Sequence, residues 1–114
     1  MSRKARNTIA KREAFAPIFA ALGDETRLAL IAKLSDGRPC SIAQLTDGTE
    51  LTRQAITKHL RVLEGARLVR GVRAGRESLF ELDPAPIREV RDYADMVSAQ
   101  WDQALDRLKA FVEK

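Results

Sequence analysis

The sequence is poor in the residues on which most enzymes and metal sites depend. Of its 114 residues, only Cys40 is a cysteine and only His59 is a histidine. A single cysteine excludes an internal disulfide and fits a reducing cytosol. The single histidine stands beside a lysine, and the chain has no nucleophile–base pair, glycine-rich phosphate loop or metal-ligand cluster. We therefore expect that the protein is not an enzyme and that it binds no cofactor.

Long hydrophobic runs are also missing. No apolar stretch approaches the roughly 18 residues that a membrane span requires, and the charged N-terminus is not followed by the apolar run of a signal peptide. Six glycines and four prolines argue against a low-complexity chain. With 45% hydrophobic and 32% charged residues, the composition predicts one soluble, cytoplasmic globular domain without membrane contact.

Positive charge is present but unevenly distributed. The net charge is +4, and basic residues crowd the N-terminus and residues 51–82, whereas the chain turns acidic after Asp83. The middle of the chain is therefore predicted to face a polyanion. The alternative is that these basic residues only solvate a surface.

The first third of the chain predicts a tail and two helices. Residues 1–9 are expected to form a flexible basic tail, and residues 10–114 the folded domain. Residues 10–22 have helical periodicity, but Pro17 lies inside them and could start, kink or break the helix. Asp24 is the expected N-cap of a second helix over residues 25–35, whose inward side chains are expected to be Leu28, Ile31, Ala32 and Leu34.

The centre of the chain predicts a helix-turn-helix. Ser41 caps a short helix over residues 42–46, and Thr52 caps a longer one after a glycine-containing turn. The longer helix has an apolar face with Val62 beside it, and a basic polar face. The apolar face is formed by Ala55, Ile56, Leu60 and Leu63. Residues 68–73 and 78–82 then predict a β-hairpin around a turn at residues 74–77.

The last predicted helix, about residues 86–112, has an unbroken heptad seam. Such a helix is about 40 Å long, whereas a domain of this size has a radius of gyration of about 13 Å. We therefore expect a two-fold dimer formed through the terminal helices. The alternative is packing on the first helix of the same chain. The residues expected in the dimer interface are Phe15, Phe19, Ile87, Val90, Ala94, Val97, Trp101, Ala104, Leu108 and Phe111.

Two segments of the sequence resemble a known family. Residues 21–28, ALGDETRL, and residues 51–63, LTRQAITKHLRVL, are similar to the corresponding motifs of ArsR/SmtB-type repressors, and the pairs Leu68-Val69 and Gly75-Arg76 fit as well. The resemblance covers residues 15–82. It implies a mainly α winged helix-turn-helix with a small β-hairpin, five helices in all, and a homodimer that represses from a promoter palindrome until a ligand releases it. Dimers of the MarR type are the nearest rival, but those chains are usually longer.

The family's metal ligands are not present in this chain. Where one family site has a Cys-x-Cys pair, this sequence has Ser41 and Ala43. The last helix contains neither histidine nor cysteine, although borderline metals prefer imidazole or thiolate ligands. The resemblance therefore implies a member without the usual metal sites. Its inducer is not readable from the sequence and could be a small molecule, another protein or nothing. Cys40 is interpreted as an apolar filler, with a thiol sensor as the alternative.

The end of the longer helix also departs from the family. A glycine usually precedes the Leu-Val pair, where the backbone requires positive φ, but this sequence has Arg67 there and Gly65 two residues earlier. Either Arg67 adopts the left-handed conformation at a cost of about 1 kcal/mol, or the helix ends sooner at Gly65.

The predicted DNA contacts follow from this arrangement. Arg53 is the best candidate for a bidentate contact to guanine and Gln54 for adenine, while Ser41 and Arg61 could bind phosphates. His59 could touch a phosphate or pack locally. The full set of expected contacts is Ser41, Thr52, Arg53, Gln54, Thr57, Lys58, His59, Arg61, Arg73 and Arg76.

Two such readers on a two-fold axis predict an inverted-repeat operator in double-stranded DNA, with half-sites about 10 base pairs apart and a wing contact beside each. The main competing interpretation is a protein-interaction module that uses a winged helix and a long coiled-coil-like helix. Steep salt dependence of DNA binding would distinguish the two.

Overall fold

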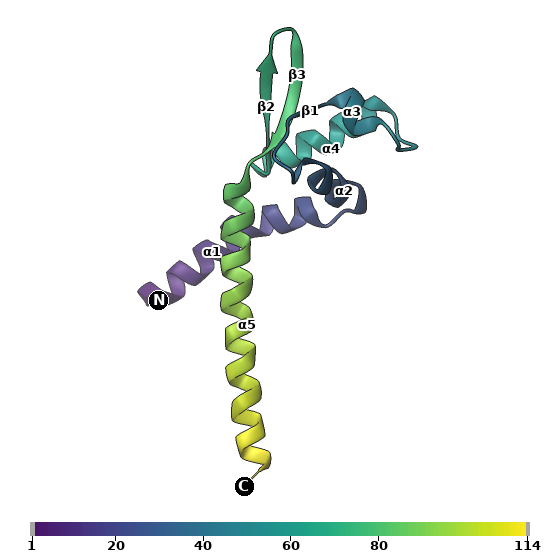
Figure 1. The fold of residues 1–114 in the computed structure, drawn as a ribbon. Coiled ribbons are helices and arrows are strands. Elements are labelled where there is room, and N and C mark those ends of the chain that lie inside the picture. The colour runs from purple at the N-terminus through teal and green to yellow at the C-terminus, as the bar shows by residue number, and fades with distance from the viewer. Residues whose placement is uncertain (1, 114) are drawn as a thin grey trace.

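The computed structural model describes residues 2–113, apart from the side chain of Thr8. Two helices cross beneath a small helix-turn-helix body, from which a β-hairpin projects (Figure 1). The elements in chain order are α1 (Arg3–Leu22), α2 (Glu25–Leu34), β1 (Cys40–Ser41), α3 (Ile42–Thr46), α4 (Arg53–Gly65), β2 (Val69–Ala74), β3 (Glu77–Leu82) and α5 (Pro84–Val112).

Helix α1 begins earlier than the sequence suggested. The Ser2 side chain caps it by accepting a hydrogen bond from the backbone N–H of Ala5 at 3.1 Å. Residues 3–9, which were expected to belong to a flexible tail, are therefore helical, and Met1 lies outside the described residues. Pro17 lies inside the helix without ending it. The sequence prediction missed this part of the helix because its residues are mostly basic and polar. The residue that caps the helix, Ser2, lies before all of them.

The hydrophobic core lies between α1, α2, α3, α4 and the sheet. Its members share near-complete burial and are Ile18, Ala21, Leu30, Leu34, Leu45, Ile56, Leu60, Leu63, Leu68 and Val69. Three expectations about it were wrong, including that of Ala32, which was expected to point inward and is exposed. Leu28 is 52% exposed and Leu30 takes the inward position, and Val62 is exposed at the edge of α4.

The sheet contains one more strand than the hairpin predicted. The two-residue strand β1 pairs antiparallel with β3, giving the order β1-β3-β2. Strands β2 and β3 pair from Val69↔Leu82 to Ala74↔Glu77, so Gly75 and Arg76 alone form the turn. Gly75 has φ +61°, which a glycine at the first position of a type II′ turn adopts without strain. The result is a narrow wing.

Both alternatives for the end of α4 are realised together. The helix ends at Gly65, and Arg67 has φ +62°. The Arg67 N–H donates to the Glu64 carbonyl at 3.0 Å and the Leu68 N–H to the Leu63 carbonyl at 2.9 Å. This pair of bonds is a Schellman motif, in which Arg67 occupies the left-handed position that usually belongs to glycine.

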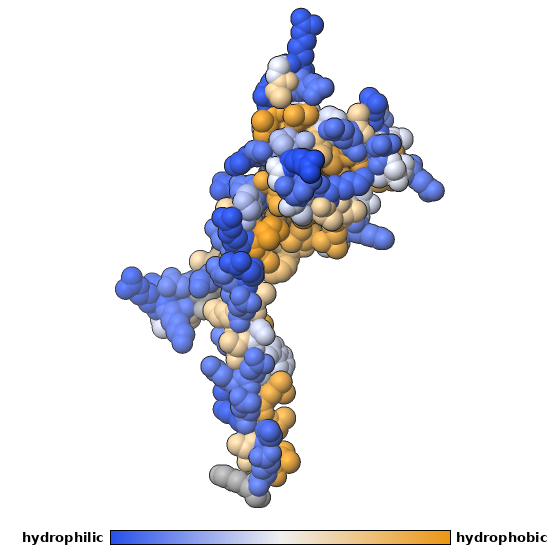
Figure 2. All heavy atoms as spheres, viewed as in Figure 1, coloured by the Kyte–Doolittle hydropathy of each residue, from blue (hydrophilic) through white to orange (hydrophobic). Residues whose placement is uncertain are grey.

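Helix α5 is the longest element and reaches far beyond the rest of the molecule (Figure 1). Its N-terminal half contacts α1, where the Tyr93 ring lies 5.2 Å from that of Phe15 and 6.2 Å from that of Phe19. Its C-terminal half carries a hydrophobic stripe (Figure 2) with Trp101 65% and Phe111 77% exposed. The radius of gyration is therefore 18.9 Å, well above the roughly 13 Å of a compact domain of this length.

None of the helices in the described part of the chain is both long and apolar enough to cross a bilayer.

Candidate nucleic-acid interface

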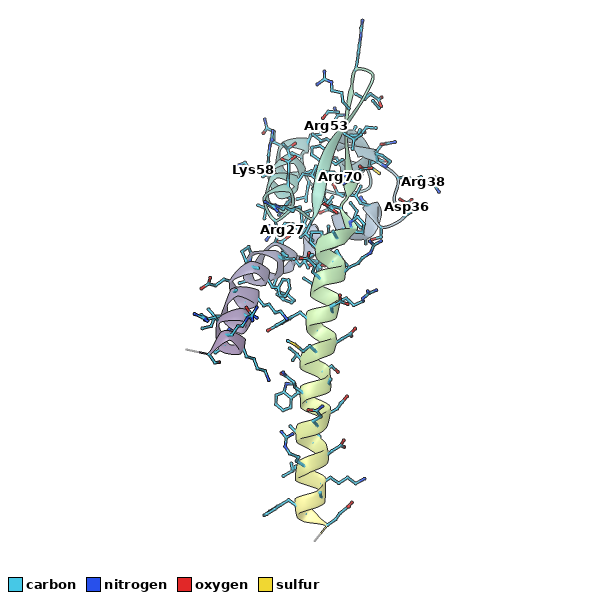
Figure 3. All side chains as sticks on the ribbon, turned by 90° about the vertical axis from the view of Figure 1, so that its left-hand side faces the viewer. Arg27, Asp36, Arg38, Arg53, Lys58 and Arg70 are labelled. Carbon is cyan, nitrogen blue, oxygen red and sulfur yellow. The ribbon has the colours of Figure 1, made fainter. Side chains whose placement is uncertain are left out.

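Helix α4 presents a polar face outward because its apolar face is anchored in the core. Ile56, Leu60 and Leu63 are buried at helical spacing. Thr52 caps the helix, as predicted, by accepting from the Ala55 N–H at 3.0 Å. The outward side chains Arg53, Gln54, Lys58 and Arg61 are all exposed, and Figure 3 shows Lys58 at the edge of the body. They can therefore reach a groove without rearrangement of the core.

The three hydroxyl groups among the predicted contacts already have roles in the fold. Thr52 caps α4, and the Thr57 hydroxyl donates to the Arg53 carbonyl at 2.7 Å. Ser41 accepts from the Gln44 N–H at 3.1 Å, while the Gln44 side chain accepts from the Ser41 N–H at 2.8 Å. This is a capping box at the start of α3. The Thr52 and Ser41 oxygens act as acceptors there, so their O–H groups remain free to donate to DNA.

The Lys33 side chain stabilises the turn between α3 and α4. Its ammonium donates to the carbonyls of Leu45 at 3.1 Å and Asp47 at 3.3 Å, which lie at the C-terminal end of α3, where a cation is favourable. Beside this turn is an open hollow of about 490 Å³ that extends to Arg53. Its lining residues are Ala43, Gln44, Thr46, Asp47, Gly48, Thr49 and Arg53. The contact made by Lys33 therefore fixes the surface next to the groove-facing side chains.

The wing has one engaged arginine and two available ones. Arg70 and Glu81 face each other across β2 and β3, with Nε and Oε1 2.8 Å apart. The hydrogen bond from Arg70 to Glu81, together with the charge of Glu81, raises the pKa of Arg70. Arg73 lies on the outer part of β2 and Arg76 at the turn, and both are exposed. Arg73 and Arg76 are therefore the wing cations that can reach DNA.

Arg61 is shared with a neighbour. Its guanidinium lies 3.6 Å from the Glu64 carboxylate, one helical turn away, and both side chains are well exposed. An exposed pair of this kind contributes little to stability. It can therefore open to release Arg61 toward a phosphate.

His59 lies on a different side of α4 from Thr57 and Arg61. It is two residues from Thr57 and from Arg61, and side chains at that spacing do not face the same way on a helix. Its Nδ1 lies 3.2 Å from an Arg27 guanidinium nitrogen and 3.8 Å from an Asp24 carboxylate oxygen. Of the two roles considered for His59, this placement favours local packing.

Asp24 completes that cluster. Its carboxylate accepts from the Arg27 backbone N–H at 3.0 Å and caps α2, as predicted. This hydrogen bond, assisted by the charge of Arg27, lowers the pKa of Asp24. The link between Arg27 and His59 was not visible in the sequence, because the two residues are far apart in the chain and have no common motif.

The positions that correspond to metal ligands in the resembled family hold Ser41 and Ala43, and Ser41 is occupied in the capping box. Cys40 lies half-buried in β1, with its Sγ 3.7 Å from the Arg38 carbonyl oxygen. Within residues 2–113, no group of three or more histidine, cysteine, aspartate or glutamate side chains is arranged to hold a metal ion.

Comparison with known proteins agrees with this geometry. Residues 22–72 match a helix-turn-helix domain family. The HTH-type transcriptional regulator Rv2034 of Mycobacterium tuberculosis is 35% identical over 85 residues, which cover 75% of this chain and 76% of that protein. An ArsR-like transcriptional regulator from Rhodococcus sp. RHA1 superposes with a TM-score of 0.82 at 32% identity, over 92% of this chain and 95% of that one. This chain belongs to the ArsR/SmtB-type family of winged helix-turn-helix regulators.

A further ArsR/SmtB-type relative is the HTH-type transcriptional repressor SmtB of Mycobacterium tuberculosis. It is 30% identical over 70 residues, which cover 61% of this chain and 51% of that protein. The protein is accordingly a DNA-binding transcriptional regulator. Within this fold α4 occupies the position called the recognition helix, and β2 and β3 form the wing.

Proposed function

We propose that this ArsR-family regulator is a homodimeric repressor that occupies an inverted-repeat operator in the cytoplasm. The observation that carries the proposal is the exposed apolar stripe of α5, which leaves large side chains such as Trp101 and Phe111 in solvent. A second copy of the chain would cover this stripe and place two recognition helices on a two-fold axis. Repression is proposed by analogy with the relative that is named a repressor.

The proposed dimer interface contains the predicted seam and one residue that the prediction omitted. Ile87, Val90, Val97 and Ala104 are already partly covered within one chain, whereas the seam residues Trp101, Leu108 and Phe111 are exposed. Tyr93 joins α1 to α5 through Phe15 and Phe19. The two aromatic residues of α1 therefore brace α5 in this chain, with Phe19 still 44% exposed toward a partner.

In the proposed complex, α4 enters the major groove. Arg53 and Gln54 read base edges, and Thr57 and Lys58 line the same exposed face. Thr52, Ser41 and Arg61 contact the DNA phosphates and so position the DNA backbone. Arg73 and Arg76 reach the neighbouring minor groove or its phosphates. His59 is not included, because its ring is turned toward α2.

The inducer is proposed to be something other than a metal bound at the family's usual positions. The side chains at those positions do not provide thiolate or imidazole ligands, which borderline metals require. Release from DNA would then follow from a small molecule that changes the packing of the terminal helices.

Selection of bound duplexes from a random pool tests the proposal directly. We expect an inverted repeat whose half-sites are about 10 base pairs apart, and affinity that falls steeply with salt because bound phosphates release counterions. A selected sequence without two-fold symmetry would contradict the dimeric reader. A flat salt response together with a stable hetero-complex would instead indicate a protein-interaction module.

A further inference from the structure

Arg27 stands where three helices meet, as Figure 3 shows near the end of α1. It belongs to the first turn of α2, but its side chain reaches both α1 and α4. We infer that Arg27 is a positioning residue for DNA binding, because its guanidinium ties the C-terminal end of α1 to the recognition helix through His59. The inference rests on the proposed function, in which α4 reads the operator.

One side of the guanidinium holds the end of α1. Its Nε donates to the Ala21 carbonyl, and its Nη2 lies 3.4 Å from the Ala20 carbonyl. These carbonyls belong to the last turn of the helix, where the regular ladder runs out of donors and a positive charge is favourable. Arg27 therefore caps a helix to which it does not belong.

The other side of the guanidinium holds α4. Its Nη1 lies 3.2 Å from the His59 Nδ1. The Asp24 carboxylate is 3.8 Å from the His59 Nδ1, which is beyond hydrogen-bond distance. Asp24 instead anchors the Arg27 backbone N–H at 3.0 Å. Arg27 is thus fixed at its backbone and bridges two helices with its side chain.

This geometry assigns the tautomer of His59. A guanidinium has only donors, so Nδ1 must accept, and the proton of the neutral ring must be on Nε2. A doubly protonated ring would direct an N–H at the guanidinium and break the link. The His59 side chain is 25% exposed, and within residues 2–113 no buried side-chain nitrogen or oxygen lacks a hydrogen-bond partner. Nε2, which has no hydrogen-bond partner among the described residues, is therefore open to solvent.

The link matters because α1 and α4 belong to different functional parts. Phe15 and Phe19 of α1 pack on Tyr93 of the long helix, whereas α4 faces DNA. Apolar contacts between α1 and α4 are not directional, but hydrogen bonds are. The bonds of Arg27 therefore set the tilt of α4 relative to the dimer helices. Two half-sites at fixed spacing require that tilt, whereas non-specific DNA does not.

The first test is spectroscopic and needs no DNA. Long-range ¹H–¹⁵N correlation of the His59 ring at alkaline pH should show Nδ1 as the unprotonated nitrogen. In Arg27→Ala, the two tautomers should become mixed. A wild-type ring with its proton on Nδ1, or an unchanged spectrum in Arg27→Ala, would overturn the inference.

The second test is a double-mutant cycle on purified protein. Arg27→Ala and His59→Ala should each raise the operator Kd by about tenfold, and the double variant should lose no more than either single variant. Affinity for scrambled duplex should change little. Circular dichroism at the assay temperature ensures that only folded protein is compared. Additive losses, or equal losses on both DNAs, would contradict a coupled positioning role.

Arg38→Ala is the matched control, because it removes the same charge from a side chain that is 85% exposed and forms an ion pair with Asp36. This variant should weaken binding to the operator and to the scrambled duplex slightly and equally. If the wild type shows no preference for any operator, the proposed function fails. The spectroscopic result still decides whether Arg27 holds His59.

Discussion

Arg67 has a backbone conformation that is unfavourable for any residue with a Cβ. Its φ of +62° belongs to the left-handed region, where a Cβ costs roughly 1–2 kcal/mol. The Schellman hydrogen bonds at Glu64 and Leu63 hold it there. The sequence showed that a departure existed at this position, but not that the helix end at Gly65 and the strained arginine would coexist.

Arg67→Gly should therefore stabilise the protein. We expect the free energy of unfolding to rise by about 1 kcal/mol, or slightly less because glycine loses more conformational entropy on folding. Urea denaturation followed by circular dichroism measures the change. Arg67→Ala is the control, since it removes the charge but keeps the Cβ. A gain in Arg67→Ala equal to that in Arg67→Gly would attribute the effect to charge instead.

Asp24 predicts a specific pH dependence. Its pKa is lowered in the folded state by the Arg27 backbone N–H and by the charge of Arg27. A lowered pKa means that its stabilising contribution is complete above the ordinary value of about 3.9 and is lost as the pH falls through the lower folded value. Asp24→Asn keeps a capping side chain but cannot titrate.

The measurement for Asp24 is the free energy of unfolding of both proteins across the acid range. Wild type should be more stable than Asp24→Asn at neutral pH, and the difference should shrink below about pH 4. A difference in the free energy of unfolding that stays constant down to the lowest pH would show that folding does not lower the pKa of Asp24.

The recognition helix and the wing act differently as elements. Helix α4 presents Arg53 from a rigid, core-anchored face, whereas the wing presents Arg76 at the tip of a narrow hairpin. We therefore expect base readout from α4, and sequence-independent phosphate or groove contact from the wing.

Arg53→Ala should relax sequence preference and cost about 1–3 kcal/mol on the operator. Arg76→Ala should weaken operator and scrambled DNA alike. Binding of both variants to both duplexes over a salt series separates the two roles. Equal losses for both variants on both DNAs would contradict this division between helix and wing.

How far elements could be predicted depended on whether their signals were local. Asp24, Ser41 and Thr52 are caps whose partners lie three residues away, and all three were correctly predicted to cap helices. Strand β1 was missed because two residues carry no periodicity, and it exists only through its pairing with β3. The placement of Leu28 failed for a similar reason, since burial in α2 depends on which side α4 and the sheet cover.

The candidate interface divides in the same way. The outward face of α4 followed from its apolar face, so the exposure of Arg53 and Lys58 was predictable. The contacts that set the position of this face were not, because Lys33 and Arg27 act on residues distant in the chain.

At the scale of the whole molecule, the dominant feature is the mismatch between a small core and a long helix. The molecule extends 67 Å along its longest axis, and the exposed stripe includes Trp101, Leu105 and Leu108. A soluble monomer rarely leaves so continuous an apolar surface uncovered. The proposed pairing with a second copy would remove it from water.

Trp101→Glu should therefore shift the protein from dimer to monomer. A charge placed in the covered seam would be desolvated without a partner, while the distant core should stay folded. Light scattering after gel filtration measures the mass, and operator binding should weaken greatly. Gln103→Glu, with the same new charge two residues away on another face of α5, is the control. A monomeric wild type, or a dimeric Trp101→Glu variant, would exclude this interface.

The open stripe of α5 also sets how the regulator responds to its own abundance. If only paired chains fill an operator, then below the dimer dissociation constant the occupied fraction rises with the square of the monomer concentration. If the chain represses as a dimer, as proposed, each apolar side chain along the stripe would lower the abundance at which repression begins. The C-terminal half of α5, which contributes little to the core of its own chain, would then act as the dosage threshold of the genes under control.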